Sequence, residues 1–269
     1  MFNNKKWLAT LLALGMALTL LAGCGSGPAA SPAPAEKPPE KPAESLSGKS
    51  LFVYCGAGMT KPFGEIAEAF KAESGAEVEV VYANAAQIQT QIKTTQEGDL
   101  FIAGSVEELN PVKDVVAGSK ELVKHVPVLA VKSGNPLKIT GLKDLTKKDV
   151  EVVLGDAEAT PIGKIANKAL TDLGVLAEVN VIARTATAPE MITALSVDQC
   201  DAIIVWKENV SGSGIEIVNT TDLDAQIKKI PAATLSFSKN TETTAALLKF
   251  FDTDQAKSIW EKYGYEVVK

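Results

Sequence analysis

Apolar positions alternate between two spacings along most of the chain after residue 50. Residues 51–54 form a short apolar run of β-prone side chains, which is typical of a buried strand. A helical stripe with the spacing i, i+3, i+4, i+7 follows, made of Phe63, Ile66, Ala67 and Phe70. Pro62 suits the first turn of this helix and Gly75 its end. The pattern therefore predicts a strand, a turn and an amphipathic helix.

The same alternation continues to the C-terminus. Further strands are predicted at about 78–82, 99–103, 125–132, 151–154, 179–183 and 201–206. Further helices are predicted to begin near 84 and to span about 161–173, 189–196, 241–251 and 254–263. Strands that alternate with helices of this length indicate an α/β fold with mainly parallel sheets. Ligands of such folds bind beside the carboxyl ends of strands. The candidate loops are 55–60, 83–87, 156–163 and 186–190.

The N-terminal segment has the pattern of a targeting signal. Lys5 and Lys6 precede a largely apolar run of 15 residues, from Trp7 to Leu21. This run is shorter than the roughly 20 residues that a membrane-spanning helix needs. The sequence Leu-Ala-Gly-Cys at 21–24 resembles the bacterial lipobox, in which the cysteine is lipid-modified. We predict a lipoprotein signal peptide at 1–23 and a lipid anchor on Cys24.

A proline-rich segment follows the predicted anchor. Residues 25–50 hold six of the 13 prolines in the chain, mixed with alanine, serine, glutamate and lysine. Such a composition buries too little apolar surface to offset the entropy of ordering, and prolines extend the chain. We predict that 24–50 is a lipidated, disordered tether and that 51–269 carries the fold.

Charge and residue counts narrow the possible functions. The 27 basic and 33 acidic residues give a net charge of −6, which becomes −8 without Lys5 and Lys6. An acidic chain is not expected to bind nucleic acid. One histidine and three cysteines exclude a His-rich metal site and a four-cysteine zinc site. Cys55 and Cys200 could pair outside the cytoplasm, but two free, buried thiols are the favoured prediction.

The strand-to-helix loops favour anion binding over catalysis. The glycines of loop 55–60 and the alanines of loop 83–87 leave backbone N–H groups accessible at helix starts. Several such helix starts around one site would bind an anion without lysine or arginine. No phosphate-binding, dinucleotide-binding or serine-hydrolase motif is present. His125 and Cys200 are a conceivable base and nucleophile, but both lie beside buried strands, so we expect no enzyme.

Five stretches of the chain carry a resemblance to a known family. They are 51–70 (LFVYCGAGMTKPFGEIAEAF), 81–105 (VYANAAQIQTQIKTTQEGDLFIAGS), 154–170 (LGDAEATPIGKIANKAL), 189–210 (PEMITALSVDQCDAIIVWKENV) and the C-terminal helices that end at Tyr263-Gly264-Tyr265. Together they resemble the molybdate-binding, type II periplasmic solute-binding proteins of ABC importers. The resemblance implies two α/β lobes joined by crossing strands. Lobe 1 would comprise about 51–128 and 232–269, and lobe 2 about 129–231. It also implies a monomeric protein, lipid-anchored on the extracytoplasmic side, that needs no cofactor and delivers molybdate or tungstate to an ABC permease.

The resemblance implies a set of ligand residues in lobe 1, although two family features are missing. The family places a serine at the position of Gly58 and another near Ala85 or Ala86, and neither hydroxyl is present here. The implied donors are the backbone N–H groups of Gly58, Met59 and Ala86. The nearest replacement side chains are those of Thr60, Asn84 and Gln87.

Lobe 2 supplies the remaining implied contacts. Backbone N–H groups at Ile162 and Met191 match two family contacts, and Trp206 stands where the family has a tyrosine. An indole N–H can donate one hydrogen bond. Glu190 or Asp156 could complete an expanded coordination of the metal centre, as carboxylates do in an archaeal tungstate and molybdate subgroup. The favoured alternative for both carboxylates is a surface or helix-capping role.

Three hypotheses for the function follow. The first is capture of molybdate or tungstate for an ABC importer. The missing serines motivate the second, in which a protein with the same transport role binds sulfate, another oxyanion or a small organic anion. The third is a lipid-anchored enzyme or sensor subunit with the same two-lobe fold. No loop combines an acid, a base and a nucleophile, which counts against the third.

Overall fold

The computed structural model describes residues 45–210 and 214–268. The predicted signal peptide, the lipid anchor at Cys24 and most of the predicted tether lie outside these residues. Residues 45–50 were also expected in the tether, but they belong to the folded domain. Leu46 is buried in its core, and the backbone N–H of Leu46 donates to Ser74 O at 2.8 Å. The folded part therefore extends before the predicted start at 51, because the Leu46 side chain is buried and backbone hydrogen bonds hold the segment.

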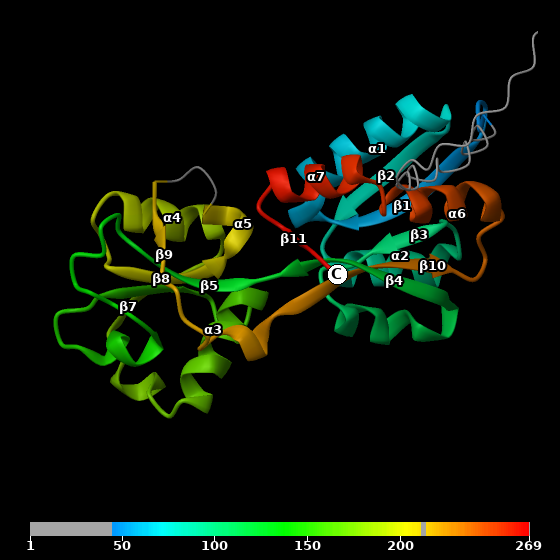
Figure 1. Cartoon of the computed structure of the whole chain (residues 1–269). Coiled ribbons are helices and arrows are strands. Elements are labelled where there is room, and N and C mark those ends of the chain that lie inside the picture. Colours follow the sequence, from blue (N-terminus) through cyan, green and yellow to red (C-terminus); the bar gives the residue numbers. More distant parts are fainter. Residues whose placement is uncertain (1–44, 211–213, 269) are drawn as a thin grey trace, which may run out of the picture. The chain divides into compact units, whose positions relative to one another are not determined.

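The first sheet has six strands in the order β11-β4-β10-β3-β1-β2 (Figure 1). The strands are β1 (Ser50–Gly56), β2 (Glu77–Ala83), β3 (Leu100–Ile102), β4 (Val116–His125), β10 (Lys228–Leu235) and β11 (Glu266–Val267). Strand β1 runs parallel to β2 and β3, whereas β10 is antiparallel to both β3 and β4. Strand β11 is antiparallel to β4.

The second sheet has five strands in the order β7-β6-β8-β5-β9. The strands are β5 (Pro127–Val131), β6 (Val152–Gly155), β7 (Val181–Thr185), β8 (Ala202–Trp206) and β9 (Glu216–Ile217). Strand β6 is parallel to β7 and β8, while β5 is antiparallel to β8 and β9. The α/β class is thus confirmed. The sheets are mixed rather than mainly parallel, because strands that enter from the other sheet join them in the opposite direction.

Four helices follow parallel strands at the expected places, the two predicted C-terminal helices come after β10, and a short helix after β8 was not predicted. The helices are α1 (Thr60–Ser74), α2 (Ala85–Thr95), α3 (Pro161–Asp172), α4 (Ala188–Ser196), α5 (Lys207–Val210), α6 (Thr241–Phe250) and α7 (Asp254–Lys262). Short 3-10 segments are η1 (Ala57–Met59), η2 (Val106–Val115), η3 (Leu142–Thr146), η4 (Leu176–Glu178) and η5 (Asp224–Gln226). Gly75 ends α1 in the left-handed conformation, with φ of 79°, as the sequence predicted.

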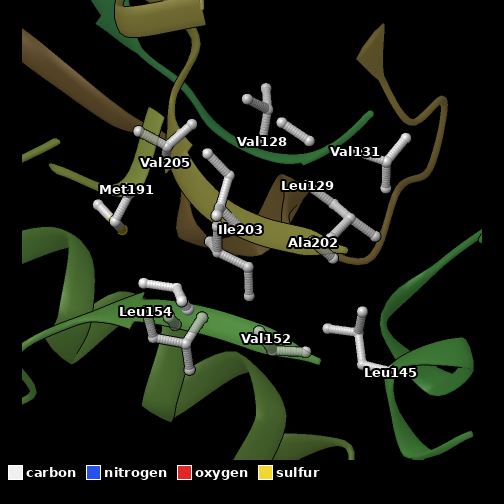
Figure 2. Packing of buried hydrophobic residues seen from close by; sticks show 14 of the residues in the cluster. Val128, Leu129, Val131, Leu145, Val152, Leu154, Met191, Ala202, Ile203 and Val205 are labelled. Carbon is white, nitrogen blue, oxygen red and sulfur yellow. The ribbon is translucent and has the colours of Figure 1, made fainter. Parts of the chain in front are cut away.

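Each sheet has its own hydrophobic core. The core of the second sheet is packed from β5, β6 and β8 and from helices α3 and α4. Figure 2 shows Met191 of α4 among side chains of β6 and β8, such as Leu154 and Val205. The first sheet is covered by one cluster that includes α1 and α7 and by a second that includes α2 and η2. Both cores hold their strand ends fixed, which positions the loops that follow.

The chain passes between the two sheets at two described places. Strand β4 of the first sheet ends at His125, and β5 of the second begins at Pro127. The return lies between β9 and β10. The predicted lobe limits at 128/129 and 231/232 fall inside β5 and β10. The division into lobes at those residues stays a prediction.

Candidate ligand-binding site

The carboxyl ends of three strands meet at one edge of the first sheet. Gly56 at the end of β1 lies opposite Ala83 at the end of β2. Cys55 of β1 lies opposite Ile102, where β3 ends. The loops that lead into α1, α2 and η2 therefore begin side by side. Two of them are the first-lobe loops that the sequence predicted as ligand-binding.

The first loop presents an exposed glycine. No side chain caps the start of η1 or of α1. A Cβ at Gly58 would meet no atom within 4 Å, so the space over this residue is open. The Thr60 hydroxyl donates to Ala57 O at 2.7 Å, which leaves only its oxygen lone pairs for other partners. Met59 is buried at 3% exposure, so its side chain is part of the core.

The second loop divides its N–H groups between the helix cap and solvent. Asn84 Oδ1 accepts from the N–H of Gln87 at 3.0 Å. The first intrahelical bond runs from the N–H of Ile88 to Asn84 O at 3.1 Å. The N–H groups of Ala85 and Ala86 precede that bond and are open to a ligand. Asn84 and the backbone of Gln87 are therefore engaged in capping α2, while Ala86 is exposed.

A third loop at this edge was not predicted as part of the site. The N–H of Gly104 donates to Glu108 Oε2 at 2.7 Å, and Gly104 O lies 3.4 Å from His125 Nδ1. Burial raises the pKa of the Glu108 carboxyl. Gly104 and Ser105 stood inside one of the quoted family stretches. The glycine after a buried strand was the only signal that could have singled out this loop.

The second sheet offers a corresponding edge. Strands β6 and β8 are parallel, with Val153 opposite Ile203, so their ends at Gly155 and Trp206 lie at the same edge. Thr160 Oγ1 caps α3 by accepting from the N–H of Gly163 at 3.1 Å. The N–H of Ile162 precedes the first intrahelical bond and is left uncapped. The Ile162 side chain is buried, so only its backbone can face a ligand.

Both candidate carboxylates of this lobe have local partners. Asp156 Oδ1 accepts from the N–H groups of Glu158 at 2.9 Å and Ala159 at 2.7 Å, which lowers the pKa of Asp156. Glu190 Oε2 accepts from the N–H groups of Ala186 and Thr187, each at 3.0 Å. The geometry favours the helix-capping role for Glu190. Asp156 instead stabilises the turn before α3, whose N-cap is Thr160. Within 45–210 and 214–268, no cluster of three or more His, Cys, Asp or Glu side chains could hold a metal ion.

Met191 and Trp206 differ in what they can offer. The Met191 side chain is fully buried, so the predicted contact is confined to its backbone. Trp206 is 9% exposed and stacks on His125, with the ring centroids 3.6 Å apart. Its indole N–H donates to no acceptor in the described part of the chain. The indole is thus an available donor at the end of β8.

The described residues form two surface hollows, and the first includes Ala186, Pro189 and Glu190 of the predicted loop 186–190. One, of about 640 Å³, lies beside β7 and α4 and is lined by Arg184 and Glu190 among others. The other, of about 500 Å³, lies between α1 and α7. Of the predicted ligand residues, only Glu190 lines either hollow.

The two internal cysteines are free and buried, as predicted. Desolvation raises the pKa of the Cys200 thiol to about 11. The pKa of the Cys55 thiol is also raised by burial. A thiol that stays protonated near neutral pH is a poor nucleophile. His125 is paired with Glu208 and not with Cys200, so the conceivable base–nucleophile pair does not form.

The sequence pattern of the bacterial extracellular solute-binding proteins matches residues 51–266. The chain belongs to this family. Its members bind solutes, in agreement with the expectation of a non-enzymatic protein. A molybdate-binding protein from Escherichia coli, ModA, is 25% identical over 80% of this chain and 88% of its own length. In the part that the structure describes, no helix is long and apolar enough to cross a membrane.

Solved structures share the fold. The "substrate binding domain of putative molybdenum ABC transporter from Clostridium difficile" superposes with a TM-score of 0.74 and 23% identity, over 82% of this chain and all of that one. The sulfate-binding protein SubI from Mycobacterium tuberculosis superposes with a TM-score of 0.63 and 16% identity, over 82% of this chain and 88% of that one. These likenesses confirm the periplasmic-binding-protein architecture of two α/β lobes.

Proposed function

We propose that this solute-binding protein captures a tetrahedral oxyanion, molybdate or tungstate, and delivers it to an ABC importer. One observation carries the proposal: two helix starts with uncapped N–H groups, at Gly58 and at Ala86, begin side by side at one sheet edge. Aligned N–H groups and helix dipoles stabilise a bound anion without a charged side chain. The identity to a molybdate-binding relative supports the choice of ligand.

The mechanism that we propose is exchange of water for backbone donors. The anion enters between the lobes, and N–H groups near Gly58, Ala86, Ile162 and Met191, with the indole of Trp206, replace its hydration shell. Closure of the lobes then excludes water and strengthens these hydrogen bonds. Because the net charge of the chain is negative, recognition has to be local, with the long-range repulsion screened by salt.

A specific observation favours a second candidate ligand. Gly58 and Ala86 offer no hydroxyl donor to the site. Loss of a hydroxyl donor to a charged ligand costs about 1.5–3 kcal/mol unless another group replaces it. Sulfate, another oxyanion or a small organic anion is therefore the alternative ligand, with the same transport role.

A calorimetric titration separates the two. The purified protein is titrated with molybdate, tungstate, sulfate and phosphate at one salt concentration. Tight binding of molybdate or tungstate, with weak binding of sulfate, is the expected result. If neither metal oxyanion gives heat or a thermal shift, the molybdate proposal fails. A native mass spectrum of the protein as purified then identifies any retained anion by its added mass.

The sequence of the first 24 residues supports a proposal for where the protein is located in the cell. We propose that Cys24 carries the lipid that holds the domain at the extracytoplasmic membrane surface, near the permease. Metabolic labelling with a radioactive fatty acid tests this. The unchanged protein is expected to take up label and to remain with the membrane, whereas a Cys24→Ser variant is not. Label that persists in Cys24→Ser would contradict the anchor.

A further inference from the structure

The single histidine of the chain joins both sheets beside the candidate site. His125 ends β4, and its Nε2 lies 2.7 Å from Glu208 Oε1 on α5. Its Nδ1 lies 3.4 Å from Gly104 O, at the edge where β3 ends. The ring stacks on Trp206 with an interplanar angle of 20°. His125 thus connects the edge of the first sheet to the indole of Trp206, which ends a strand of the second sheet.

The surroundings of this ring offer an acceptor to each of its nitrogens. Both ring nitrogens face oxygen acceptors, a carboxylate and a carbonyl. A neutral imidazole carries one N–H and serves one of them, whereas the imidazolium donates to both. The face of the Trp206 indole also attracts a cation placed over it. The side chain of His125 is 18% exposed, so it is accessible to solvent.

The same cluster reaches the first ligand loop. The Tyr265 hydroxyl lies 3.4 Å from Gly58 O, to which it donates, and the Tyr265 ring centroid lies 6.2 Å from that of His125. Gly264, with φ of 88°, leaves room for Glu208, whose Cα would lie 2.8 Å from a Cβ placed there. The contacts therefore run without a gap from Gly58 through Tyr265 and His125 to Trp206.

The charges that face His125 are mainly negative. Glu208 on α5 has 9% of its side chain exposed, and Glu108 on η2 is a second carboxyl near the ring. Tyr265 is neutral, because burial raises the pKa of its hydroxyl well above the usual range. The neighbouring Lys124 and Lys207 are both paired with Glu266. An anion that binds here approaches partly buried carboxylates, and a proton on His125 offsets that repulsion.

We propose that His125 is a positioning residue of the oxyanion site, which fixes the Trp206 indole and takes up a proton when the anion binds. This inference rests on the proposed function. Coupling between two binding events is reciprocal, so a proton that favours the anion also makes anion affinity depend on pH. Affinity should therefore rise as the pH falls from about 8 to about 6.

The test combines calorimetry with NMR on the full chain, prepared without a polyhistidine tag. Because the chain has one histidine, its imidazole resonances are unambiguous. The Trp206 indole resonance is assigned from its loss in Trp206→Phe. The dissociation constant of the oxyanion that binds most tightly in the calorimetric screen is measured from about pH 8 to about pH 6. We expect it to fall roughly fivefold or more, at the lower end of typical couplings.

Two variants and a matched control separate coupling from a structural role. His125→Phe keeps an aromatic stack, and His125→Gln keeps a hydrogen-bonding side chain, but neither takes up a proton. Both should bind with a flat pH profile. Glu121→Gln is the control, because Glu121 lies on the same strand, pairs with Lys229 at the surface and does not contact the cluster. It should keep the profile of the unchanged protein.

The outcomes distinguish this inference from the proposed function. The expected NMR result is a shift of the His125 resonances toward the protonated form when ligand is added at constant pH, together with a shift of the Trp206 indole resonance. Binding with the same pH profile in His125→Phe, His125→Gln and the unchanged protein would overturn the role of His125 and leave the oxyanion proposal standing. Absence of binding by any oxyanion would overturn both.

Discussion

Glu190 accepts a hydrogen bond from the N–H of Thr187, three residues earlier, at 3.0 Å. The same carboxylate oxygen accepts from the N–H of Ala186, so this side chain serves the start of α4. Glutamate at the third helical position commonly plays this part. These hydrogen bonds stabilise the start of α4, so they account for the position of Glu190 without a contact to the ligand.

The first prediction separates these roles with two substitutions. Glu190→Ala removes the helix-start acceptor and should lower the free energy of unfolding by about 1 kcal/mol. Glu190→Gln keeps an acceptor at that position and should be nearly neutral. Both variants should bind the oxyanion at least as tightly as the unchanged protein, because a nearby negative charge has been removed. Urea unfolding and calorimetry measure the two effects. Weaker binding by both variants would instead make Glu190 a ligand residue.

The second prediction concerns the open space over Gly58. Gly58→Ser introduces a hydroxyl donor without a clash, since no atom lies within 4 Å of the added Cβ. It should tighten binding by roughly 1.4 kcal/mol, about tenfold, if the hydroxyl reaches the anion. Gly58→Val places two methyl groups over the same N–H groups and should abolish measurable binding. Both melting temperatures should stay close to that of the unchanged protein. Equal affinity in all three proteins would exclude the first loop from the site.

The third prediction concerns the Trp206 indole. Trp206→Phe keeps an aromatic ring against His125 but removes the N–H donor, and should weaken oxyanion binding by roughly 1.4 kcal/mol, about tenfold. Tyr263→Phe is the matched control, because it also removes one aromatic donor, here the partner of Glu65, and neither residue is in the predicted ligand set. Its affinity should not change. Calorimetry measures the oxyanion affinity of both variants. Unchanged affinity in Trp206→Phe would remove the indole from the ligand set.

The parallel strands and their helices could be predicted from the sequence because their patterns are local. The stripe that includes Phe63 and Phe70 and the stop at Gly75 were enough to place α1. Strands β4 and β10 were not predicted. In β10 the register shifts between Ile230 and Pro231 and again between Thr234 and Leu235, so the two-residue alternation of a strand is interrupted. Their place in the sheet depends on pairing with distant residues.

The site shows the same limit. Loops 55–60 and 83–87 followed from the pattern, because small residues between a strand and a helix are a local signal. The contacts of His125 with Glu208, Gly104 and Trp206 join residues that are far apart in sequence. Local spacing along the chain does not predict such contacts. The local partners of Asp156, in a turn, and of Glu190, at a helix start, lie within four residues in sequence, so a short-range pattern could suggest them.

The last prediction uses the close backbone approach at the start of α3. A Cβ at Gly163 would lie 2.1 Å from Asp156 O, a distance that no real contact permits, so the loop or the helix start has to move. Gly163→Ala should therefore lower the free energy of unfolding by about 3 kcal/mol, near the upper end for overpacked sites. Gly58→Ala, at a glycine with no neighbour within 4 Å, is the control and should change stability by less than about 0.5 kcal/mol.

Because Ile162 directly precedes Gly163, the movement in Gly163→Ala also displaces the Ile162 N–H, and the oxyanion affinity of the folded variant should fall at least about tenfold. Urea unfolding and calorimetry on both variants measure these changes. A destabilised Gly163→Ala that binds as tightly as the unchanged protein would place Ile162 outside the ligand site.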